Sequence, residues 1–199
     1  MMKSTLVRLI SLGAILIALA GCTAVTAQNP SGSLRPVNAV AEGEDSAVML
    51  KGADVVAYFT QNQYLQGSPQ FKSNYQGVTF RFASAANKAL FDKEPMKYQP
   101  QYGGYCADGL VYGIPWGGDA DTWRMVNGKL YIFGGAGSRD AWLLDEPRNL
   151  VLADKYWKEE AEGSNSFWQR SKRLVFRVPH YKTGAELAAM VAEAKTRKP

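Results

Sequence analysis

Histidine and cysteine are scarce in this chain of 199 residues, which contains one histidine, His180, and two cysteines, Cys22 and Cys106. A tight site for a soft transition metal needs two to four Cys, His or Met ligands. A catalytic cysteine needs a base within hydrogen-bonding reach, and the only imidazole follows Pro179 near the end of the chain. The composition therefore argues against a Cys/His metal site and against thiol hydrolysis.

Only one long apolar run is present, over residues 9–20, and Lys3 and Arg8 precede it without an acidic residue. This pattern predicts an export signal, because the run is too short for a membrane span. Residues 19–22, Leu-Ala-Gly-Cys, resemble the lipobox of bacterial lipoproteins, in which the cysteine is diacylated and becomes the first residue of the mature chain. We therefore expect a lipoprotein signal peptide over residues 1–21 and lipidation at Cys22. A plain signal peptide or an uncleaved anchor is the alternative.

A lipid-anchored protein of this kind lies on the periplasmic side of the cell envelope. Thr23 predicts delivery to the outer membrane if the source is Gram-negative, by resemblance to the sorting rule of enteric bacteria. Cys106 is then the single free thiol of the mature chain and has no partner for an intrachain disulfide. Because oxidising compartments disfavour exposed thiols, we expect Cys106 to be buried, a ligand or reactive.

Charge is distributed unevenly along the chain, whose formal net charge is +5. Residues 164–199 contain eight basic and two acidic residues, whereas residues 22–163 carry a net charge of −3. A basic tail thus follows a mildly acidic body. This asymmetry, together with export, argues against nucleic acid as a partner.

Composition divides the mature chain into three parts. Residues 22–45 have few large apolar residues and are expected to form a flexible tether, and residues 46–162 are expected to form one compact domain. Residues 163–199 form a basic segment with a helix over about 184–196, in which Thr183 and Glu186 make a capping box. This helix is expected to pack on its own domain; the alternative is that the basic, aromatic segment docks to anionic lipid or to another envelope protein.

Two hairpins and several short helices predict an α+β fold, with a small antiparallel sheet of two hairpins and a C-terminal helical appendage. The hairpins turn at Gln76-Gly77 and at Asn127-Gly128, between runs of alternating apolar and polar residues. Ser84 is a predicted N-cap for a helix over 85–93, which ends where Pro95 forbids continuation. Ser138 and Asn149 are predicted caps for helices over 139–146 and 150–161.

These segments resemble the exported branch of the YHS domain family. The resemblance rests on "LKGADVVAYF", on "YQGVTFRFASAANKALFDKEPMKYQPQYGGYCADG" and on "DTWRMVNGKLYIF", in this order over roughly residues 47–160. Relatives of the short domain occur in copper-transporting ATPases and beside some hydroxylases, which implies metal binding. In metal-associated relatives, thiols are expected at positions that here are Ala57, Ala83 and Asn87. The resemblance therefore implies the fold without the ligand set.

Cys106 has three readings, in the order structural, pocket and metal. A buried, inert cysteine is the commonest fate of this residue type. Alternatively, the thiol faces a small-ligand pocket walled by nearby aromatic residues, with Gly103 and Gly104 supplying close approach or positive φ. The candidate pocket residues are Cys106, Tyr98, Tyr102, Tyr105, Trp116 and Trp123. A copper site would have to draw on Cys106, Met96 and Met125.

The sequence favours a non-catalytic envelope protein that binds a small ligand or a partner protein and reaches the membrane through a lipid anchor. No cofactor is expected. The alternatives are an accessory protein that handles a copper-type metal and a thiol-dependent enzyme that uses Cys106.

Overall fold

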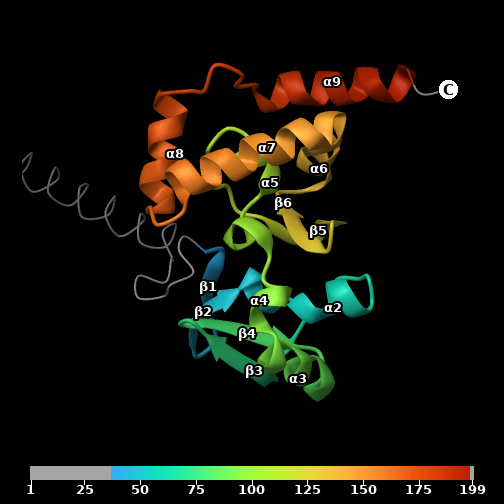
Figure 1. Ribbon diagram of the computed structural model, residues 1–199, viewed down its shortest axis with the longest axis vertical. Helices are drawn as coiled ribbons and strands as arrows, with labels where there is room; N and C mark the ends of the chain where they lie inside the picture. Colours follow the sequence, from blue (N-terminus) through green and yellow to red (C-terminus); the bar gives the residue numbers. More distant parts are fainter. Residues whose placement is uncertain (1–36, 198–199) are drawn as a thin grey trace, which may run out of the picture.

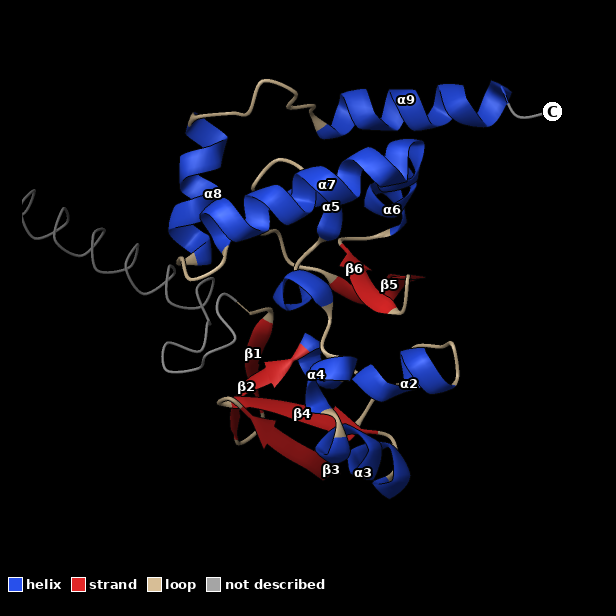
Figure 2. Ribbon diagram, viewed as in Figure 1, coloured by secondary structure: helices blue, strands red, loops and turns tan. Residues whose placement is uncertain are grey.

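The computed structural model describes residues 37–197, which form a sheet part and a helical part stacked on it (Figures 1 and 2). The expected signal peptide, Cys22 and the first part of the expected tether lie outside the described residues. Within residues 37–197, no helix is both long enough and apolar enough to cross a membrane.

The strands of the sheet part form one four-stranded sheet in the order β1-β2-β4-β3, counted over the described residues. Their bounds are β1 (Ala39–Glu42), β2 (Asp45–Met49), β3 (Ser68–Tyr75) and β4 (Val78–Phe82). β3 and β4 form the first predicted hairpin, which turns through the left-handed backbone of Gln76 (φ 52°) and Gly77 (φ 78°). β2 runs parallel to β4, paired through Val48 and Thr79, so this sheet is mixed rather than antiparallel.

The second predicted hairpin is also present, as β5 (Asp119–Val126) and β6 (Lys129–Phe133). Asn127 (φ 51°) and Gly128 (φ 71°) both have the positive φ that a type I′ turn requires. This hairpin forms a sheet of its own. The α+β class is confirmed, but the expectation that both hairpins share one antiparallel sheet is corrected.

β6 explains the separation, because it is buried on both faces. Leu130 and Ile132 pack in a first hydrophobic cluster with the four-stranded sheet, and Tyr131 and Phe133 pack in a second cluster with the helices. None of the four is more than 4% exposed. Alternate side chains of a strand point to opposite faces. β6 therefore lies between the two hydrophobic clusters. It pairs with β5 in a separate sheet and does not extend the four-stranded sheet.

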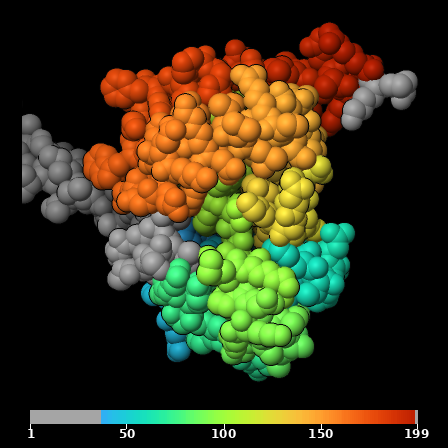
Figure 3. Space-filling view, in the orientation of Figure 1, coloured from blue at the N-terminus to red at the C-terminus, as the bar shows by residue number. Residues whose placement is uncertain are grey.

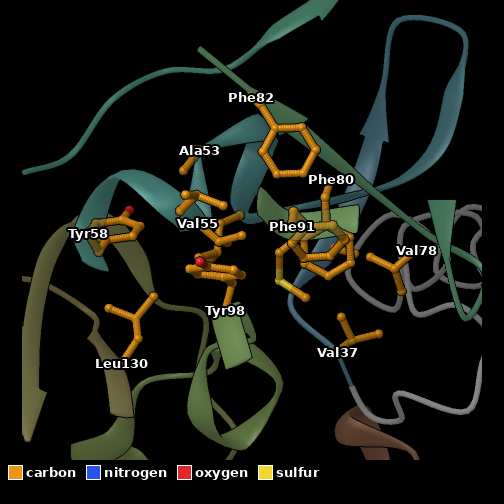
Figure 4. Packing of buried hydrophobic residues seen from close by; sticks show 14 of the residues in the cluster. Val37, Ala53, Val55, Tyr58, Val78, Phe80, Phe82, Phe91, Tyr98 and Leu130 are labelled. Atoms are coloured by element: carbon orange, nitrogen blue, oxygen red, sulfur yellow. The ribbon is translucent and has the colours of Figure 1, made fainter. Parts of the chain in front are cut away.

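The first cluster fills the space between the four-stranded sheet and three short helices, and Figure 4 shows its aromatic centre. The helices are α2 (Val55–Thr60), α3 (Ala85–Lys93) and α4 (Pro95–Tyr98). Phe91 of α3 lies 4.5 Å from Phe80 and 5.1 Å from Phe82, measured between ring centroids. The hydroxyl of Ser84 accepts a hydrogen bond from the Asn87 amide at 3.1 Å, which confirms the predicted N-cap of α3.

The second cluster belongs to the helical part, of which α6 to α9 form the orange and red upper part of Figure 3. The helices of this part are α5 (Ala107–Leu110), α6 (Ala136–Trp142), α7 (Glu146–Tyr156), α8 (Ser166–Val175) and α9 (Gly184–Arg197). α6 begins after the left-handed Gly135, and α7 begins after Asp145, whose carboxylate caps it. The predicted caps Ser138 and Asn149 are therefore wrong, and both residues lie inside helices.

Part of the expected tether is folded. Val37 is 0% exposed and Ala39 2%, and both belong to the first cluster. The Asn38 side chain donates hydrogen bonds to the carbonyls of Gly104 (3.0 Å) and Gly118 (3.1 Å). Small apolar residues suffice to add β1 to the sheet because β2 supplies the backbone partners. The folded structure thus includes residues 37–45, which the composition assigned to the tether.

α9 confirms the predicted C-terminal helix and its capping box. The Thr183 hydroxyl accepts from the Glu186 amide at 3.2 Å, and the Glu186 carboxylate accepts from the Thr183 amide at 2.7 Å. Leu187 packs against the second cluster, and Lys195 Nζ lies 2.6 Å from Asp140 Oδ2 on α6. α9 is therefore attached to the helical part at both ends.

Deleting residues 183–199 should lower the thermal unfolding midpoint by several degrees. The deletion exposes apolar surface around Leu187, and a loss of about 1 to 3 kcal/mol shifts the midpoint by roughly 2 to 4 °C per kcal/mol in a chain of this size. Differential scanning calorimetry measures the change. Arg197→Ala, which removes a side chain that is 76% exposed, is the control and should leave the midpoint unchanged. An unchanged midpoint for the deletion would contradict the packing.

Candidate functional site

Asp54 is a buried carboxylate at the centre of the sheet part. It is 0% exposed, and it caps α2. Its Oδ1 accepts from the amides of Val56 (2.9 Å) and Ala57 (3.3 Å), and its Oδ2 accepts from the Ala83 amide (2.8 Å) and from Asn87 Nδ2 (2.6 Å). An ionised carboxylate has about four acceptor positions. All of them are therefore in use.

The three positions at which the family resemblance implies thiols all converge on this carboxylate. Ala57 and Ala83 offer only backbone amides, and Asn87 offers an amide side chain. Because the oxygens of Asp54 have no acceptor position left and no soft donor replaces the thiols, these residues do not fit a transition metal. Within residues 37–197, moreover, no group of three or more His, Cys, Asp or Glu side chains could hold a metal ion.

The three candidate soft donors lie in different environments. Cys106 is 3% exposed in the second cluster, whereas Met96 on α4 is 78% exposed. Met125 on β5 packs against the first cluster, on the other side of β6 from Cys106. The structure therefore gives no sign that these sulfurs act together as ligands.

Cys106 lies directly before α5, with its thiol turned toward α6. Sγ lies 3.7 Å from the Ser138 hydroxyl, and backbone hydrogen bonds from Gly109 and Gly134 also reach it. Burial raises the pKa of the thiol, and the nearby Asp108 raises it further, while the hydrogen bonds lower it only in part. A reactive cysteine needs a thiolate and access to solvent. Cys106 therefore has the properties of a structural thiol.

Five of the six residues of the candidate aromatic pocket are divided between the two clusters. Tyr98 belongs to the first cluster, where Figure 4 shows it among aliphatic and aromatic neighbours, and Trp123 packs against the same cluster. Tyr102 and Tyr105 belong to the second, as Cys106 does. Their hydroxyls donate to the Asp154 carboxylate at 2.8 Å and to the Val37 carbonyl at 3.1 Å. Trp116 is 43% exposed. These side chains thus serve mainly as core, in two separate places.

A pocket of about 190 Å³ lies instead between α5, the start of α7 and the C-terminal segment, and we call it the Asp108 pocket. Its apolar wall comes from side chains of these elements and of α6. The lining residues are Asp108, Val111, Tyr112, Ala141, Leu144, Asp145, Arg148, Asn149, Leu152, His180, Lys182, Leu187 and Met190. Segments far apart in the sequence therefore build one hollow.

Asp108 is the unusual member of this pocket. It is 7% exposed, and burial raises the pKa of its carboxyl to about 7. Burial is the only cause of the shift, so neither a hydrogen bond nor a positive charge from the described residues lowers it again. Asp54, by contrast, is buried even more completely, at 0% exposure, but is fully hydrogen-bonded. A buried carboxyl without a compensating partner, facing a hollow, is a candidate binding group.

Positive and aromatic groups complete the Asp108 pocket. Arg148 and Lys182 line it together with His180. The His180 Nε2–H donates to the Val111 carbonyl at 2.8 Å, and its ring stacks on Tyr112 with centroids 5.8 Å apart. His180 is thus held as part of the wall and lies against the turn after α5, whereas the Cys106 thiol faces Ser138. The arrangement does not form a Cys–His catalytic pair.

The sequence interpretation identified neither Asp54 nor Asp108 as a candidate site. Asp54 carried a detectable signal, since an Asp immediately before the apolar run of α2 is a typical N-cap. Asp108 lies on the short helix α5 and carries no local pattern that marks it as a site. Its burial depends on the C-terminal segment around His180, which no local pattern links to α5.

Cys106→Ala should lower the free energy of unfolding by about 1 to 2 kcal/mol, the amount expected for removing one small buried group. Cys106→Ser should be no more destabilising, because its hydroxyl meets the hydrogen-bonding groups of Ser138, Gly109 and Gly134. Urea unfolding followed by circular dichroism measures both. In the native protein the thiol should react slowly with DTNB; fast reaction near pH 8 would contradict the structural role.

Comparison with known families matches residues 56–102 to the YHS domain. The match runs from α2 to the turn after α4, and it includes Ala57, Ala83 and Asn87 but not Cys106 or Asp108. It is shorter than the resemblance over residues 47–160. No curated protein and no solved structure matches the chain significantly. The chain therefore contains a YHS domain at residues 56–102, and β5, β6 and helices α5 to α9 lie beyond the matched segment.

Proposed function

We propose that this chain is a non-catalytic binding protein of the cell envelope, anchored to the membrane through a lipid on Cys22, and that the Asp108 pocket holds a small ligand. The observation that carries the proposal is the buried, uncompensated carboxyl of Asp108 at a hollow. A carboxyl with a pKa raised in this way destabilises the fold at pH values above that pKa, and a strongly shifted carboxyl at a hollow is a candidate functional group.

The charges around the pocket indicate the ligand class. An ammonium group would supply the hydrogen bonds and the positive charge that Asp108 lacks. Arg148 and Lys182, which also line the pocket, would favour a negative group on the ligand. A volume of about 190 Å³ admits only a small molecule. We therefore propose a zwitterion of the amino-acid type.

A panel of the common α-amino acids tests this proposal on the full chain by thermal unfolding. At a concentration about one hundred times its Kd, a ligand stabilises the folded state by about 2.7 kcal/mol, which corresponds to a rise of roughly 5 to 10 °C in the midpoint. Asp108→Asn should abolish that rise. Asp119→Asn, which changes a carboxylate of a separate hollow, is the matched control and should retain it. If no amino acid raises the midpoint, or if one raises it equally in Asp108→Asn, the proposed ligand class is wrong.

The pH dependence of binding gives a second test. An ammonium ligand binds the ionised carboxyl, so its affinity should fall about tenfold per pH unit below the pKa of about 7 and become constant above it. Isothermal titration calorimetry between pH 5 and pH 8 measures this dependence. A ligand whose affinity does not change over this range would bind without using Asp108.

The proposed lipidation of Cys22 can be tested separately from ligand binding. Cys22→Ser should abolish incorporation of labelled palmitate and leave an unprocessed precursor, because the thiol is the acylation site of a lipobox. Cys106→Ser is the matched control and should retain the label, since Cys106 is buried in the folded protein. Unchanged labelling of Cys22→Ser would contradict the anchor.

Metal handling, the alternative that the family resemblance implies, is the weaker proposal. The Asp54 carboxylate already accepts four hydrogen bonds, and Cys106 is a buried thiol with a raised pKa. One equivalent of copper that co-purifies with the chain and is lost in Cys106→Ala would reverse this order.

A further inference from the structure

α8 has its polar side turned inward and much of its apolar side turned outward. Ser166 and Gln169 are buried, with 1% and 5% exposure. Trp168 is 68% exposed, Val175 73%, and Phe176, which follows the helix directly, 69%. A surface helix normally buries its apolar stripe. The orientation of α8 is therefore the reverse of the usual one.

Hydrogen bonds and ion pairs on the inner side hold α8 in this orientation. Gln169 Nε2 donates to the Gly113 carbonyl and to Glu160 Oε2, both at 2.9 Å. Arg173 forms a two-point ion pair with Glu160, with Nε 2.8 Å from Oε2. Burial raises the pKa of Glu160, but hydrogen bonds from Arg173, Gln169 and Lys172 outweigh it and lower the pKa to about 2. Rotating the helix to bury Trp168 would break this network.

The outward residues follow helical spacing. Trp168, Lys172 and Val175 are four and three residues apart, which places them along one side of α8. The Lys172 side chain is half-exposed there, and its Nζ also lies 3.0 Å from Glu160 Oε2. Leu174, at 44% exposure, and Phe176 widen the apolar surface at the end of the helix, where Arg177 is also exposed. We call Trp168, Lys172, Leu174, Val175, Phe176 and Arg177 the α8 face. Figure 1 shows α8 at the outer edge of the helical part, away from β5 and β6.

Charge around the α8 face is positive. Residues 163–185 contain five basic residues and no acidic residue, and the inward carboxylate of Glu160 leaves a net charge of +4. The nearest other acids along the chain are Glu159 and Glu162 before this segment and Glu186 directly after it, and the positive charges of Lys182 and Arg177 act on Glu186. Exposed Trp, Leu and Phe side chains bordered by Lys and Arg are typical of helices that lie in the headgroup region of anionic bilayers. Exposed Trp and Arg side chains also occur at protein interfaces, but an excess of positive charge spread over the whole segment favours an anionic lipid surface.

We propose that the α8 face docks onto the surface of an anionic lipid bilayer, with Trp168, Val175 and Phe176 inserted at the headgroup level and Lys172 and Arg177 beside lipid phosphates. This surface is distinct from the Asp108 pocket and does not depend on it. Docking orients the helical part toward the membrane.

A fluorescent label at residue 175 tests the proposal in the full chain. Val175→Cys is made together with Cys22→Ser and labelled with an environment-sensitive fluorophore; Cys106 is buried and is the same in every variant. Val151→Cys, at a position of α7 with 69% exposure, is the matched control. Acrylamide quenching is measured without vesicles, with phosphatidylcholine vesicles and with vesicles that also contain phosphatidylglycerol. Because the label is on the α8 face, it reports the surroundings of that face even if another part of the chain also binds the vesicle.

We expect a blue shift and a severalfold fall in quenching at residue 175, only with phosphatidylglycerol, and no change at residue 151. Lys172→Ala and Arg177→Ala should each weaken this protected state about fivefold, the effect of one basic residue at an anionic surface. Three results would overturn the proposal. They are a label at 175 that stays quenchable on anionic vesicles, protection that does not depend on anionic lipid, and protection without vesicles, which would mean that protein covers the α8 face.

Discussion

Asp108→Asn should stabilise the protein near pH 8 by about 2 to 4 kcal/mol relative to the wild type, and the gain should shrink toward zero near pH 4. The carboxyl has an ordinary pKa of 3.8 when the chain is unfolded, and burial raises it to about 7 in the folded protein. A shift of one pKa unit corresponds to about 1.4 kcal/mol. The shift therefore sets an upper limit of roughly 4 kcal/mol on the gain.

The sign follows from proton binding. Between pH 4 and pH 7 the folded protein keeps a proton on Asp108 that the unfolded chain has released, so the free energy of unfolding falls as the pH rises. The stabilisation by the neutral carboxyl is complete below the unfolded pKa and is lost as the pH passes through the folded pKa. An amide stays neutral throughout and avoids this loss.

Urea unfolding of wild type and Asp108→Asn at several pH values measures the difference. Comparing the two proteins removes the opposite contributions of Asp45 and Glu160, whose pKa values are lowered by ion pairs and hydrogen bonds and whose stabilisation is lost at low pH. Asp119→Asn, an exposed carboxylate on β5, should show no such pH-dependent gain. A constant difference between wild type and Asp108→Asn across the pH range would mean that water solvates Asp108.

The two readouts of this substitution separate structure from function. If Asp108→Asn gains stability and loses ligand binding, the carboxyl is a binding group that the fold retains at an energetic disadvantage. If it gains stability in a protein that binds no amino acid, Asp108 is only a buried acid and the proposed ligand class fails. The membrane proposal for the α8 face is unaffected by either result.

Local chemistry predicted the parts of the fold that depend on a few neighbouring residues. Asn127-Gly128 turns as expected because both residues tolerate positive φ. Ser84 caps α3 because its hydroxyl satisfies an amide of the first turn. The predicted helix over 139–146 ends at the residue before Pro147, because proline commonly stops a helix. In the structure Pro147 lies in the first turn of α7, where a missing amide hydrogen does no harm, so the helix boundary was displaced.

The tertiary arrangement was beyond local patterns. The apolar pattern of a strand does not predict whether its two faces pack in one hydrophobic cluster or in two. The side chains of β6 pack in two. The Asp108 pocket likewise requires α5, α7 and the segment around His180 to meet. From the sequence, Cys106 was the central candidate for a functional residue. In the structure the stronger candidate is Asp108, two residues further along the chain. Composition could not reveal this, because an Asp on a short helix reads as a solvated residue until its burial is known.

Asp54→Ala should be strongly destabilising, by roughly 3 to 5 kcal/mol, because it leaves three backbone amides and the Asn87 side chain without acceptors in a buried site. The change also removes the cap of α2, which by itself is worth about 1 kcal/mol. Asp54→Asn should have a smaller effect, because its oxygen can still accept from Val56 and Ala57. Some destabilisation is still expected, because its amide nitrogen cannot accept from Ala83 and Asn87.

Chemical unfolding compares both variants with Asp92→Ala, which removes an exposed carboxylate bound to Ser73 and Lys88 and should cost at most about 1 kcal/mol. If Asp54→Ala were as mild as Asp92→Ala, the four hydrogen bonds would not hold α2, β4 and α3 together. The positions that the family resemblance associates with metal ligands would then need another explanation.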